Sequence, residues 1–421
     1  MSKKEKIKTK SEKKPSGIKS AIKNIMALVK SGGKAELKYC VVNGNLYTLS
    51  EIEKLGYLEF SSRTKKEMPS KLYKFFPNLW TTEQGSKKPI NYSHQALINN
   101  TVFMQSPEFF DDVYDSDLHI KQEEFINIRL VSYCQACSIS ISEKQTYGES
   151  LLELAKAFHK TVIEDKREYI STFTNLPKCE KTKFRYIIFA KAVETEILKW
   201  CLRKEKETGE EWMIAIQNVL VEEYCNHIKR LRTTFRTTCF TTSSYSQLMW
   251  GGLYGDTHRG FCVEYEIDKS DKTQDVALAN LFPLIYCKSR PNMTERLANV
   301  FDGDFTFEKM WDVYFHGVLR KGIEWAQQFE WRFVLPMDNE DPSKFSQPFF
   351  KISKVYLGNR MAHKDRADII AICKEKNIPY IGVTRAADVY QMEDCPVLCE
   401  ECLHYNGGAK STKNLDEGKG V

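Results

Sequence analysis

The sequence has no run of eighteen apolar residues, which is about the shortest stretch typical of a membrane-spanning helix. Its N-terminus is lysine-rich from residue 3 and lacks the apolar core of a secretory signal peptide. It also contains no phosphate-binding glycine loop, nucleophile elbow or metal-ligand cluster of high specificity. We therefore predict a cytoplasmic protein. Its function must be inferred from patterns less specific than these motifs.

Disulfides are also not expected, although the chain has 13 cysteines. Many of them fall in predicted strands or helices, where a thiol in a reducing compartment behaves as a small buried apolar group. The densest group of cysteines, together with a histidine, spans ten residues near the C-terminus. Intervals this short hardly allow the chain to surround a metal ion with four tetrahedral ligands. Free thiols are our expectation there and a zinc ion is the alternative; the group is Cys395, Cys399, Cys402 and His404.

The excess of positive charge is confined to residues 1–35, which contain eleven Lys and two Glu and so account for more than the whole net charge of +6. We predict that about the first 17 residues are disordered, and that apolar residues at helical spacing then form a short amphipathic helix. Docking of this helix onto its own domain is one interpretation. Weak, non-specific contact with nucleic acid or an anionic membrane is the other. The helix pattern consists of Ile18, Ile22, Ile25, Met26 and Val29.

Four segments follow from the patterns along the chain. After the basic arm, residues 36–68 predict a hairpin at Asn43-Gly44 and a helix with a capping box at Ser50 to Glu53, forming a small appendage. Residues 69–394 form the core domain, with a helical insertion at about 144–231, and residues 395–421 form a flexible tail. The mixture of predicted strands and helices indicates an α+β fold with a mixed β-sheet core. The strands are Cys239–Thr241, Gly260–Ile267, Ala277–Cys287, Glu330–Pro336 and Lys351–Gly358, and the main later helices are Phe307–Trp325 and Lys364–Lys376.

The stretch from Thr237 to Glu266 is the most informative part of the chain. It joins two predicted strands through a hydroxyl cluster and a glycine-rich turn. Small residues let a ligand approach the backbone, and convergent polar groups fix its orientation. We predict a site here, formed by Thr241, Ser243, Tyr254, His258 and Arg259.

Several blocks of the chain, taken in order, resemble the bacterial domain-of-unknown-function family 2971. The resemblance covers about residues 70–392 apart from the helical insertion. Two departures are Phe76, where the family usually has Arg, and Gly251 to Tyr254, which replace a Ser-His-Tyr stretch. The matching blocks are Leu72-Tyr73-Lys74, Ser106 to Asp115, Cys239-Phe240-Thr241, Met249-Trp250, His258-Arg259-Gly260, Glu330-Trp331-Arg332 and Val355-Tyr356-Leu357-Gly358.

This layout is also similar to ADP-ribosyltransferase-like folds and to abortive-infection proteins. In those enzymes a polar residue on the first strand holds the nicotinamide ribose, a tyrosine stacks on the nicotinamide, and a late glutamate stabilises the oxocarbenium ion. The resemblance implies that Tyr73 or Lys74, Tyr254 and Glu330 have these roles with NAD as substrate. His258 is the third candidate catalytic residue, and Thr241, Ser243, Arg259 and Arg332 complete the predicted NAD-binding set.

The same residues also have structural interpretations. Glu330 and Arg332 lie two apart in an alternating strand, so they share one sheet face and could simply pair with each other. Asp111, Asp112 and Asp115 offer too few oxygen ligands for a calcium loop, and duty in turns or helix caps is the main alternative to shaping a pocket. We predict no metal site among these residues.

Two functions from different classes therefore stand, with a third behind them. The first is an NAD-consuming ADP-ribosyltransferase-like effector with a possible place in phage defence. The second is a non-enzymatic module that senses a nucleotide or another small ligand in the same cleft. The third is nucleic-acid binding through residues 1–35.

Overall fold

The computed structural model describes residues 39–55, 57–83, 88–136, 139–142, 145–164, 189, 192–193, 195–196, 209–252, 254–300, 307–337 and 342–396. The predicted basic arm, residues 1–35, lies outside these ranges. So do Cys399, Cys402 and His404 of the predicted tail.

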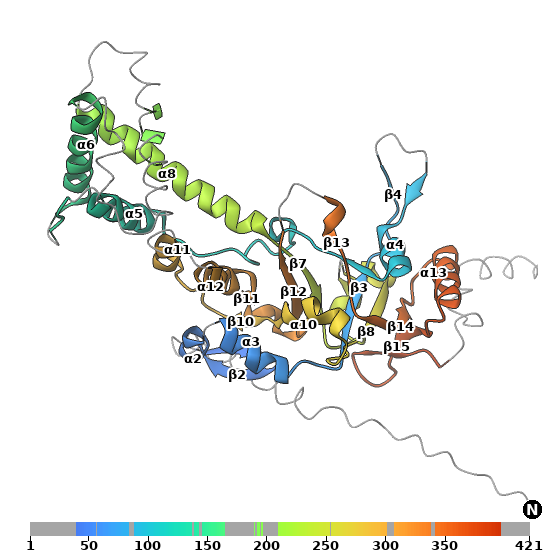
Figure 1. Ribbon diagram of the computed structural model, residues 1–421. Coiled ribbons are helices and arrows are strands. Elements are labelled where there is room, and N and C mark those ends of the chain that lie inside the picture. The colour runs from blue at the N-terminus through green and yellow to red at the C-terminus, as the bar shows by residue number, and fades with distance from the viewer. Residues whose placement is uncertain are drawn as a thin grey trace, which may run out of the picture.

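The protein has an α+β fold in which three neighbouring sheets form the core (Figure 1). The largest sheet has five strands, and only its β14–β15 pair is parallel. Helix α13 (His363–Glu375) joins these two parallel strands. Its strands, in spatial order, are β16 (Met392–Asp394), β15 (Tyr380–Arg385), β14 (Lys351–Leu357), β8 (Phe261–Glu266) and β3 (Lys71–Phe76).

A second, three-stranded antiparallel sheet consists of β7 (Phe235–Phe240), β12 (Trp331–Pro336) and β9 (Leu281–Pro283). It is joined to the large sheet where Tyr73 and Thr241 form an antiparallel bridge, with backbone N–H to O distances of 2.9 and 2.8 Å. Strand β7 therefore runs beside β3, and Lys74 of β3 also contacts Cys239 of β7. Aromatic and aliphatic side chains from both sheets share one core, which includes Phe240, Phe261 and Phe349.

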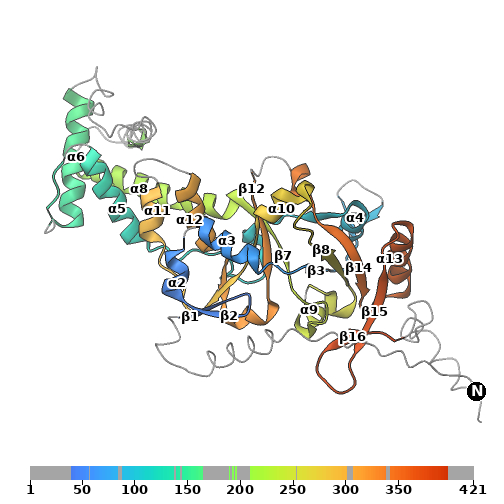
Figure 2. The ribbon, with the colours of Figure 1, turned by 60° about the horizontal axis from the view of Figure 1, so that its bottom comes forward.

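The third sheet has four strands, β11 (Arg320–Gly322), β10 (Ile285–Cys287), β1 (Tyr39–Val42) and β2 (Asn45–Thr48). The predicted hairpin is therefore not a separate appendage, because β1 pairs with β10 along its length. Helix α2 (Leu49–Lys54) follows it, and its capping box lies at Thr48 and Glu51 rather than at Ser50. The helix α3 (Tyr57–Lys66) then leads back toward β3 (Figure 2).

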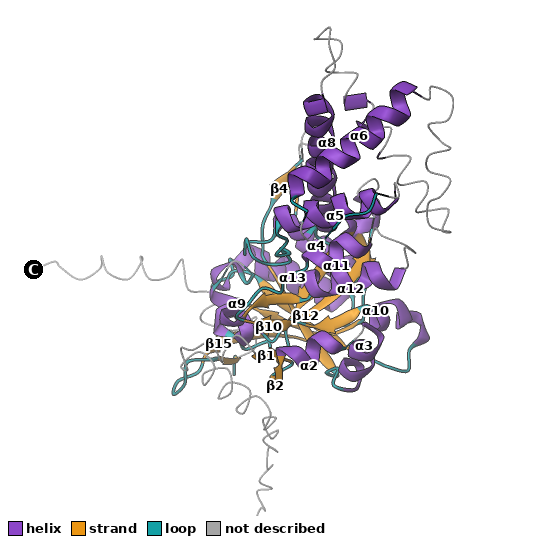
Figure 3. Ribbon diagram, turned by 90° about the vertical axis from the view of Figure 1, so that its left-hand side faces the viewer, coloured by secondary structure: helices purple, strands orange, loops and turns teal. Residues whose placement is uncertain are grey.

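A helical unit projects from the strands, as the side view in Figure 3 shows. It begins earlier than the predicted insertion, with α5 (Gln122–Ala136), and continues with α6 (Tyr147–Glu164) and α8 (Gly209–Thr234). Side chains of α11 (Thr294–Val300) and α12 (Phe307–Val318) pack into the same core. Helix α8 runs directly into β7, so the helical unit and the central sheet are continuous (Figure 1).

Smaller elements complete the described chain. Two two-stranded sheets lie beside the main ones, and α4 caps its first turn with the side chain of Asn91, which accepts from the backbone N–H of His94. None of the helices within the described ranges is both long and apolar enough to cross a membrane. The remaining elements are β4 (Thr81–Thr82), β5 (Pro89–Ile90), α4 (Tyr92–Asn99), β6 (Thr101–Phe103), η2 (Pro107–Phe109), α9 (Gln247–Gly251), η4 (Asp256–His258), η5 (Lys272–Gln274), α10 (Asp275–Ala279), η6 (Ile323–Gln328), η7 (Pro342–Phe345) and β13 (Ser346–Pro348).

Two predicted elements differ from the structure. The predicted helix Phe307–Trp325 ends at Val318, after which the chain forms β11 and then η6. The predicted strand Ala277–Cys287 is instead the end of α10 followed by β9 and β10, which belong to two different sheets. Apolar runs of this length do not distinguish a helix from a strand, and the pairing partners that decide the matter are distant in sequence.

Candidate functional site

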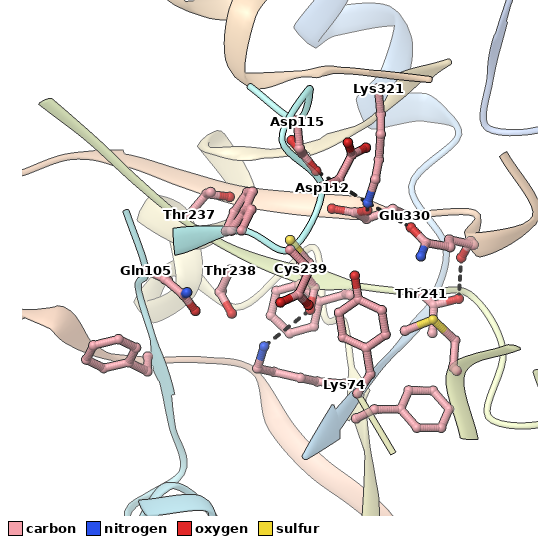
Figure 4. A pocket seen from close by; sticks show the side chains of 18 of the residues that line it. Lys74, Gln105, Asp112, Asp115, Thr237, Thr238, Cys239, Thr241, Lys321 and Glu330 are labelled. Carbon is pink, nitrogen blue, oxygen red and sulfur yellow. Dashed lines mark hydrogen bonds and ion pairs between the residues drawn. The ribbon is translucent and has the colours of Figure 1, made fainter. Parts of the chain in front are cut away.

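A pocket of about 310 Å³ lies where β3 and β7 meet the acidic loop that follows η2 (Figure 4). Its volume is at the lower end of the range typical of small-molecule sites. The residues that line it are Tyr73, Lys74, Phe75, Pro77, Phe103, Gln105, Phe109, Phe110, Asp111, Asp112, Asp115, Thr237, Thr238, Cys239, Phe240, Thr241, Met249, Tyr254, Lys321, Gln328 and Glu330.

One wall of the pocket is built on four buried charges, which we call the charge quartet: Asp115, Lys321, Glu330 and Arg332. Arg332 Nε donates to Glu330 Oε1 at 2.7 Å, and Arg332 Nη1 donates to Asp115 Oδ1 at 2.7 Å. Lys321 Nζ lies 3.0 Å from Glu330 Oε2 and 3.3 Å from Asp115 Oδ2. Two cations and two carboxylates thus neutralise one another in the interior, an arrangement that buried charges require.

Glu330 is positioned by its backbone as well as by its side chain. Its N–H donates to the hydroxyl of Tyr286 in β10 at 2.8 Å, and its carbonyl accepts from the N–H of Leu284 at 3.0 Å. The preceding residue, Phe329, has φ 47°, a left-handed conformation that turns the chain from η6 into β12. Glu330 therefore lies at the junction between the three-stranded and four-stranded sheets.

The quartet holds its members charged. Burial opposes the ionised form of Glu330, but Arg332 and Lys321 outweigh it and hold the pKa of the carboxyl at about 2. Burial likewise opposes the charged form of Lys321, yet Glu330 and Asp115 raise its pKa above the usual value. At neutral pH the pocket wall thus carries a fixed carboxylate that is a very weak base.

The opposite wall comes from β3 and from the turn after α9. Lys74 is partly buried; its Nζ donates to the carbonyl of Cys239 at 3.4 Å, and desolvation lowers its pKa. Burial raises the pKa of Tyr254 to about 12. Burial, together with the charge of Glu264, also raises the pKa of Tyr73. Both phenols therefore remain neutral, and the hydroxyl of Tyr73 is hydrogen-bonded to Glu264, which does not line the pocket.

Uncharged polar groups line the floor. Thr241 Oγ1 donates to the carbonyl of Gln328 at 2.6 Å, and Gln328 Oε1 accepts from Lys321 Nζ at 2.9 Å. Within the described part of the chain, Gln328 Nε2 and the hydroxyls of Thr237 and Thr238 find no hydrogen-bond partner, although all three residues are buried. Unsatisfied buried polar atoms beside a pocket are a feature of ligand sites, because a ligand can supply the missing partners.

The structure brings together five of the nine predicted site residues, namely Tyr73, Lys74, Thr241, Tyr254 and Glu330, as pocket-lining side chains. A sixth, Arg332, is fully buried behind Glu330 and does not line the pocket. It holds Glu330 and Asp115 in place, so the predicted pairing on one sheet face is present in the structure.

The other three predicted residues lie away from this pocket. His258 stacks on Trp250, with ring centroids 6.2 Å apart and an angle of 9°, and burial lowers its pKa. Arg259 is exposed and pairs with Asp256 at 3.1 Å, while Ser243 Oγ accepts from the N–H of Tyr245. The sequence analysis placed His258 and Ser243 in one cleft with the other site residues. Neither of them is among the residues that line this pocket.

Close backbone packing explains the position of His258. A Cβ on Gly260 would lie 2.2 Å from the carbonyl oxygen of Phe76, and one on Gly358 would lie 2.2 Å from that of His258. The glycines of this turn therefore let it pack tightly against β3 and the end of β14 rather than open toward a ligand.

The acidic loop has both of the roles that its sequence left open. Asp112 Oδ1 accepts from the N–H of Tyr114 at 2.9 Å, as expected of a turn residue, while Asp111 and Asp112 also line the pocket. Asp115 of this loop has a role that the sequence did not predict. It is 3% exposed and pairs with Arg332 and Lys321. No group of three or more potential metal ligands gathers within the described ranges.

Comparisons with known proteins add no relative: no family model, curated protein or solved structure matches this chain.

Proposed function

We propose that this pocket binds a nicotinamide nucleotide and that the protein is an NAD-consuming, ADP-ribosyltransferase-like enzyme. The observation that carries the proposal is that Tyr73, Tyr254 and Glu330, three residues far apart in the sequence, line one pocket. They are the residue types that hold the ribose, stack on the nicotinamide and stabilise a sugar cation in the enzymes that the sequence resembles.

The chemistry asked of Glu330 is electrostatic. When the bond between ribose C1′ and the nicotinamide nitrogen breaks, both electrons leave with nicotinamide and a positive charge develops on the ribosyl group. A carboxylate fixed beside that charge stabilises it without reorganising, and such fixed charges supply much of the rate enhancement of many enzymes. Water or another acceptor then bonds to C1′ and loses a proton to the solvent, because a carboxyl with a pKa of about 2 is too weak a base to hold it.

Tyr254→Ala is the sharpest single test of the pocket. It removes a half-buried ring that lines the pocket and takes part in none of the four quartet contacts. We expect it to abolish nicotinamide release from NAD, measured by chromatography with and without lysate from phage-infected cells as a trigger. The control is Tyr390→Ala, which removes a tyrosine that is 97% exposed and leaves the rate unchanged. If the wild-type protein released no nicotinamide either with or without the lysate, the proposed enzymatic activity would be refuted.

Glu330→Gln alone is a poor test of catalysis. The carboxylate pairs with Arg332 and Lys321, so its loss disturbs the fold as well as any reaction. Activity of this variant is interpretable only when its folded fraction at the assay temperature is measured in parallel.

A second function, ligand sensing without chemistry, is favoured by one specific contact pattern. Both carboxylate oxygens of Glu330 are already engaged, one by Arg332 and the other by Lys321. A carboxylate held in this way stabilises a new cation less than a free one would. Stabilisation of the protein by NAD or ADP-ribose in thermal melts, with the ligand recovered chemically unchanged, would favour sensing over turnover.

A further inference from the structure

A second pocket of about 260 Å³ lies on the other side of Lys321. It shares Lys321 and Asp112 with the first pocket, and its remaining walls come from the loop after β10, from the end of α12 and from β11. Its lining residues are Asp112, Tyr114, Asp117, Leu118, His119, Cys287, Lys288, Ser289, Arg290, Pro291, His316, Gly317, Arg320, Lys321, Gly322, Glu324 and Trp325.

One residue of this pocket, Arg320, is a buried guanidinium with few partners; it is 6% exposed. Its Nη2 meets Nδ1 of His316 at 2.8 Å, and the carboxylate oxygen that pairs with it, Glu53 Oε1, is 3.9 Å away. Its Nε and Nη1 have no hydrogen-bond partner among the described residues. Leaving such donors buried and unpaired is unfavourable, and more so when the group is charged.

Arg332 provides the comparison within the same protein. It is equally buried, yet each of its three nitrogens donates at 2.5–3.0 Å to a quartet carboxylate, to Ser116 or to the carbonyl of Val318. Arg332, a guanidinium that only protein groups stabilise, thus pairs with two carboxylates. Arg320 contacts His316 and the thiol of Cys287, and its carboxylate partner Glu53 is 3.9 Å away, so within the described residues no carboxylate lies within hydrogen-bonding distance of this guanidinium.

The rest of the pocket is suited to a phosphate ester that carries a ring. Lys288 and Arg290 add two more cations to the lining, so four basic side chains stand against the carboxylates of Asp112, Asp117 and Glu324. Arg290 is anchored by Asp117 at 2.5 Å. Two aromatic side chains, Tyr114 and Trp325, line the pocket as well. Guanidinium groups match phosphate oxygens in pairs, and aromatic faces accept a flat ring.

We propose that this second pocket binds a small molecule that carries a phosphate monoester and an aromatic ring. Its phosphate pairs with Arg320 and Arg290, and its ring lies against Trp325. Because Arg320 Nε and Nη1 are buried, the guanidinium turns toward the phosphate on binding. Exchanging a histidine contact for two charge-assisted hydrogen bonds favours this turn. The proposal is independent of any reaction in the first pocket.

Phenyl phosphate is the probe, titrated calorimetrically into the full-length protein, with inorganic phosphate and phenol as its two halves. We expect one site, weaker binding of inorganic phosphate and no detectable binding of phenol. Arg290→Gln and Arg320→Lys should each weaken phenyl phosphate about tenfold, the loss of one charge-assisted hydrogen bond. Arg63→Gln, which removes an exposed arginine outside both pockets, and Tyr254→Ala, in the first pocket, should leave the affinity unchanged.

Three results would overturn the proposal. The first is no binding of phenyl phosphate by the wild-type protein at millimolar concentration. The second is binding that both arginine variants retain in full. The third is binding that Tyr254→Ala alone removes, which would assign the probe to the first pocket. If melting shows that Arg320→Lys does not fold, Arg290→Gln decides the matter, because that change breaks only partly exposed contacts, those with Asp117 and with the ring of Tyr114.

Discussion

Replacing Glu330 by Gln probes the charge quartet directly. The substitution keeps the shape of the side chain but leaves Arg332 and Lys321 facing a single buried carboxylate, that of Asp115. In the wild-type protein these two cations hold the pKa of Glu330 at about 2, against an ordinary value of 4.5. At about 1.4 kcal/mol per pKa unit, this difference corresponds to about 3 kcal/mol of stability at neutral pH. A loss of this size is a large part of the stability of an ordinary domain.

The pH dependence has a definite sign. A carboxyl whose pKa is lowered in the folded state contributes its full stability above its unfolded pKa, and that contribution is lost as the pH falls toward the folded pKa. The window for Glu330 is therefore pH 4.5 down to about 2. The amide of the Glu330→Gln variant does not titrate, so the difference in unfolding free energy between the two proteins should be largest at pH 7 and should shrink below pH 4.5.

The assay is urea unfolding followed by tryptophan fluorescence at pH 7, 5, 4 and 3. Glu59→Gln serves as the control, because Glu59 forms an exposed helical pair with Arg63 at 2.8 Å and should change the free energy by no more than about 0.5 kcal/mol. Equal stability of Glu330→Gln and wild type at pH 7 would refute the reasoning. A difference that stays constant down to pH 3 would refute it as well, since the loss would then not come from the charge.

Three single contacts give further predictions. Tyr286→Phe removes the hydroxyl that accepts the N–H of Glu330, so it should lower the unfolding free energy by about 1–3 kcal/mol, whereas Tyr390→Phe at an exposed position should not. Burial and the charge of Glu330 raise the pKa of Cys239 to about 12, so iodoacetamide at pH 8 should label exposed Cys225 well before Cys239, and equal rates by mass spectrometry would contradict this. Thr48→Ala removes the capping box of α2 and should cost about 1 kcal/mol in thermal unfolding, most of which Thr48→Ser should restore.

Local patterns in the sequence were sufficient for two central strands of the large sheet, β8 and β14. Predicted Gly260–Ile267 and Lys351–Gly358 became Phe261–Glu266 and Lys351–Leu357, because a short run rich in apolar, β-branched and aromatic residues is a property of each strand alone. The hairpin at Asn43-Gly44 also formed, since an Asn-Gly turn needs no distant partner. Its pairing with β10 was missed because about 240 residues of chain separate the two strands.

The site was only partly predictable for the same reason. Glu330 and Tyr254 stood out as a carboxylate beside aromatic residues and a tyrosine in a glycine-rich turn. Lys321 was hidden inside a predicted helix, because apolar residues at helical spacing continue beyond Val318, where α12 ends. Asp115 could not be assigned to Arg332 from local sequence, since the two are 217 positions apart. His258 drew attention for its glycine neighbours, which in the structure serve close packing.

Both pockets depend on the charge quartet, and therefore on the assembled fold rather than on surface loops. Its members come from the acidic loop, from β11 and from the start of β12, so the wall between the pockets exists only when these three segments are assembled. Because Lys321 lines both pockets, a ligand in either one acts on a side chain that the other pocket also presents. Any ligand that requires this wall binds the folded state alone, and saturation at one hundred times its dissociation constant should then raise the stability by about 2.7 kcal/mol. A ligand that binds tightly without raising the melting temperature would therefore not bind the folded state alone, and its site would lie outside both pockets.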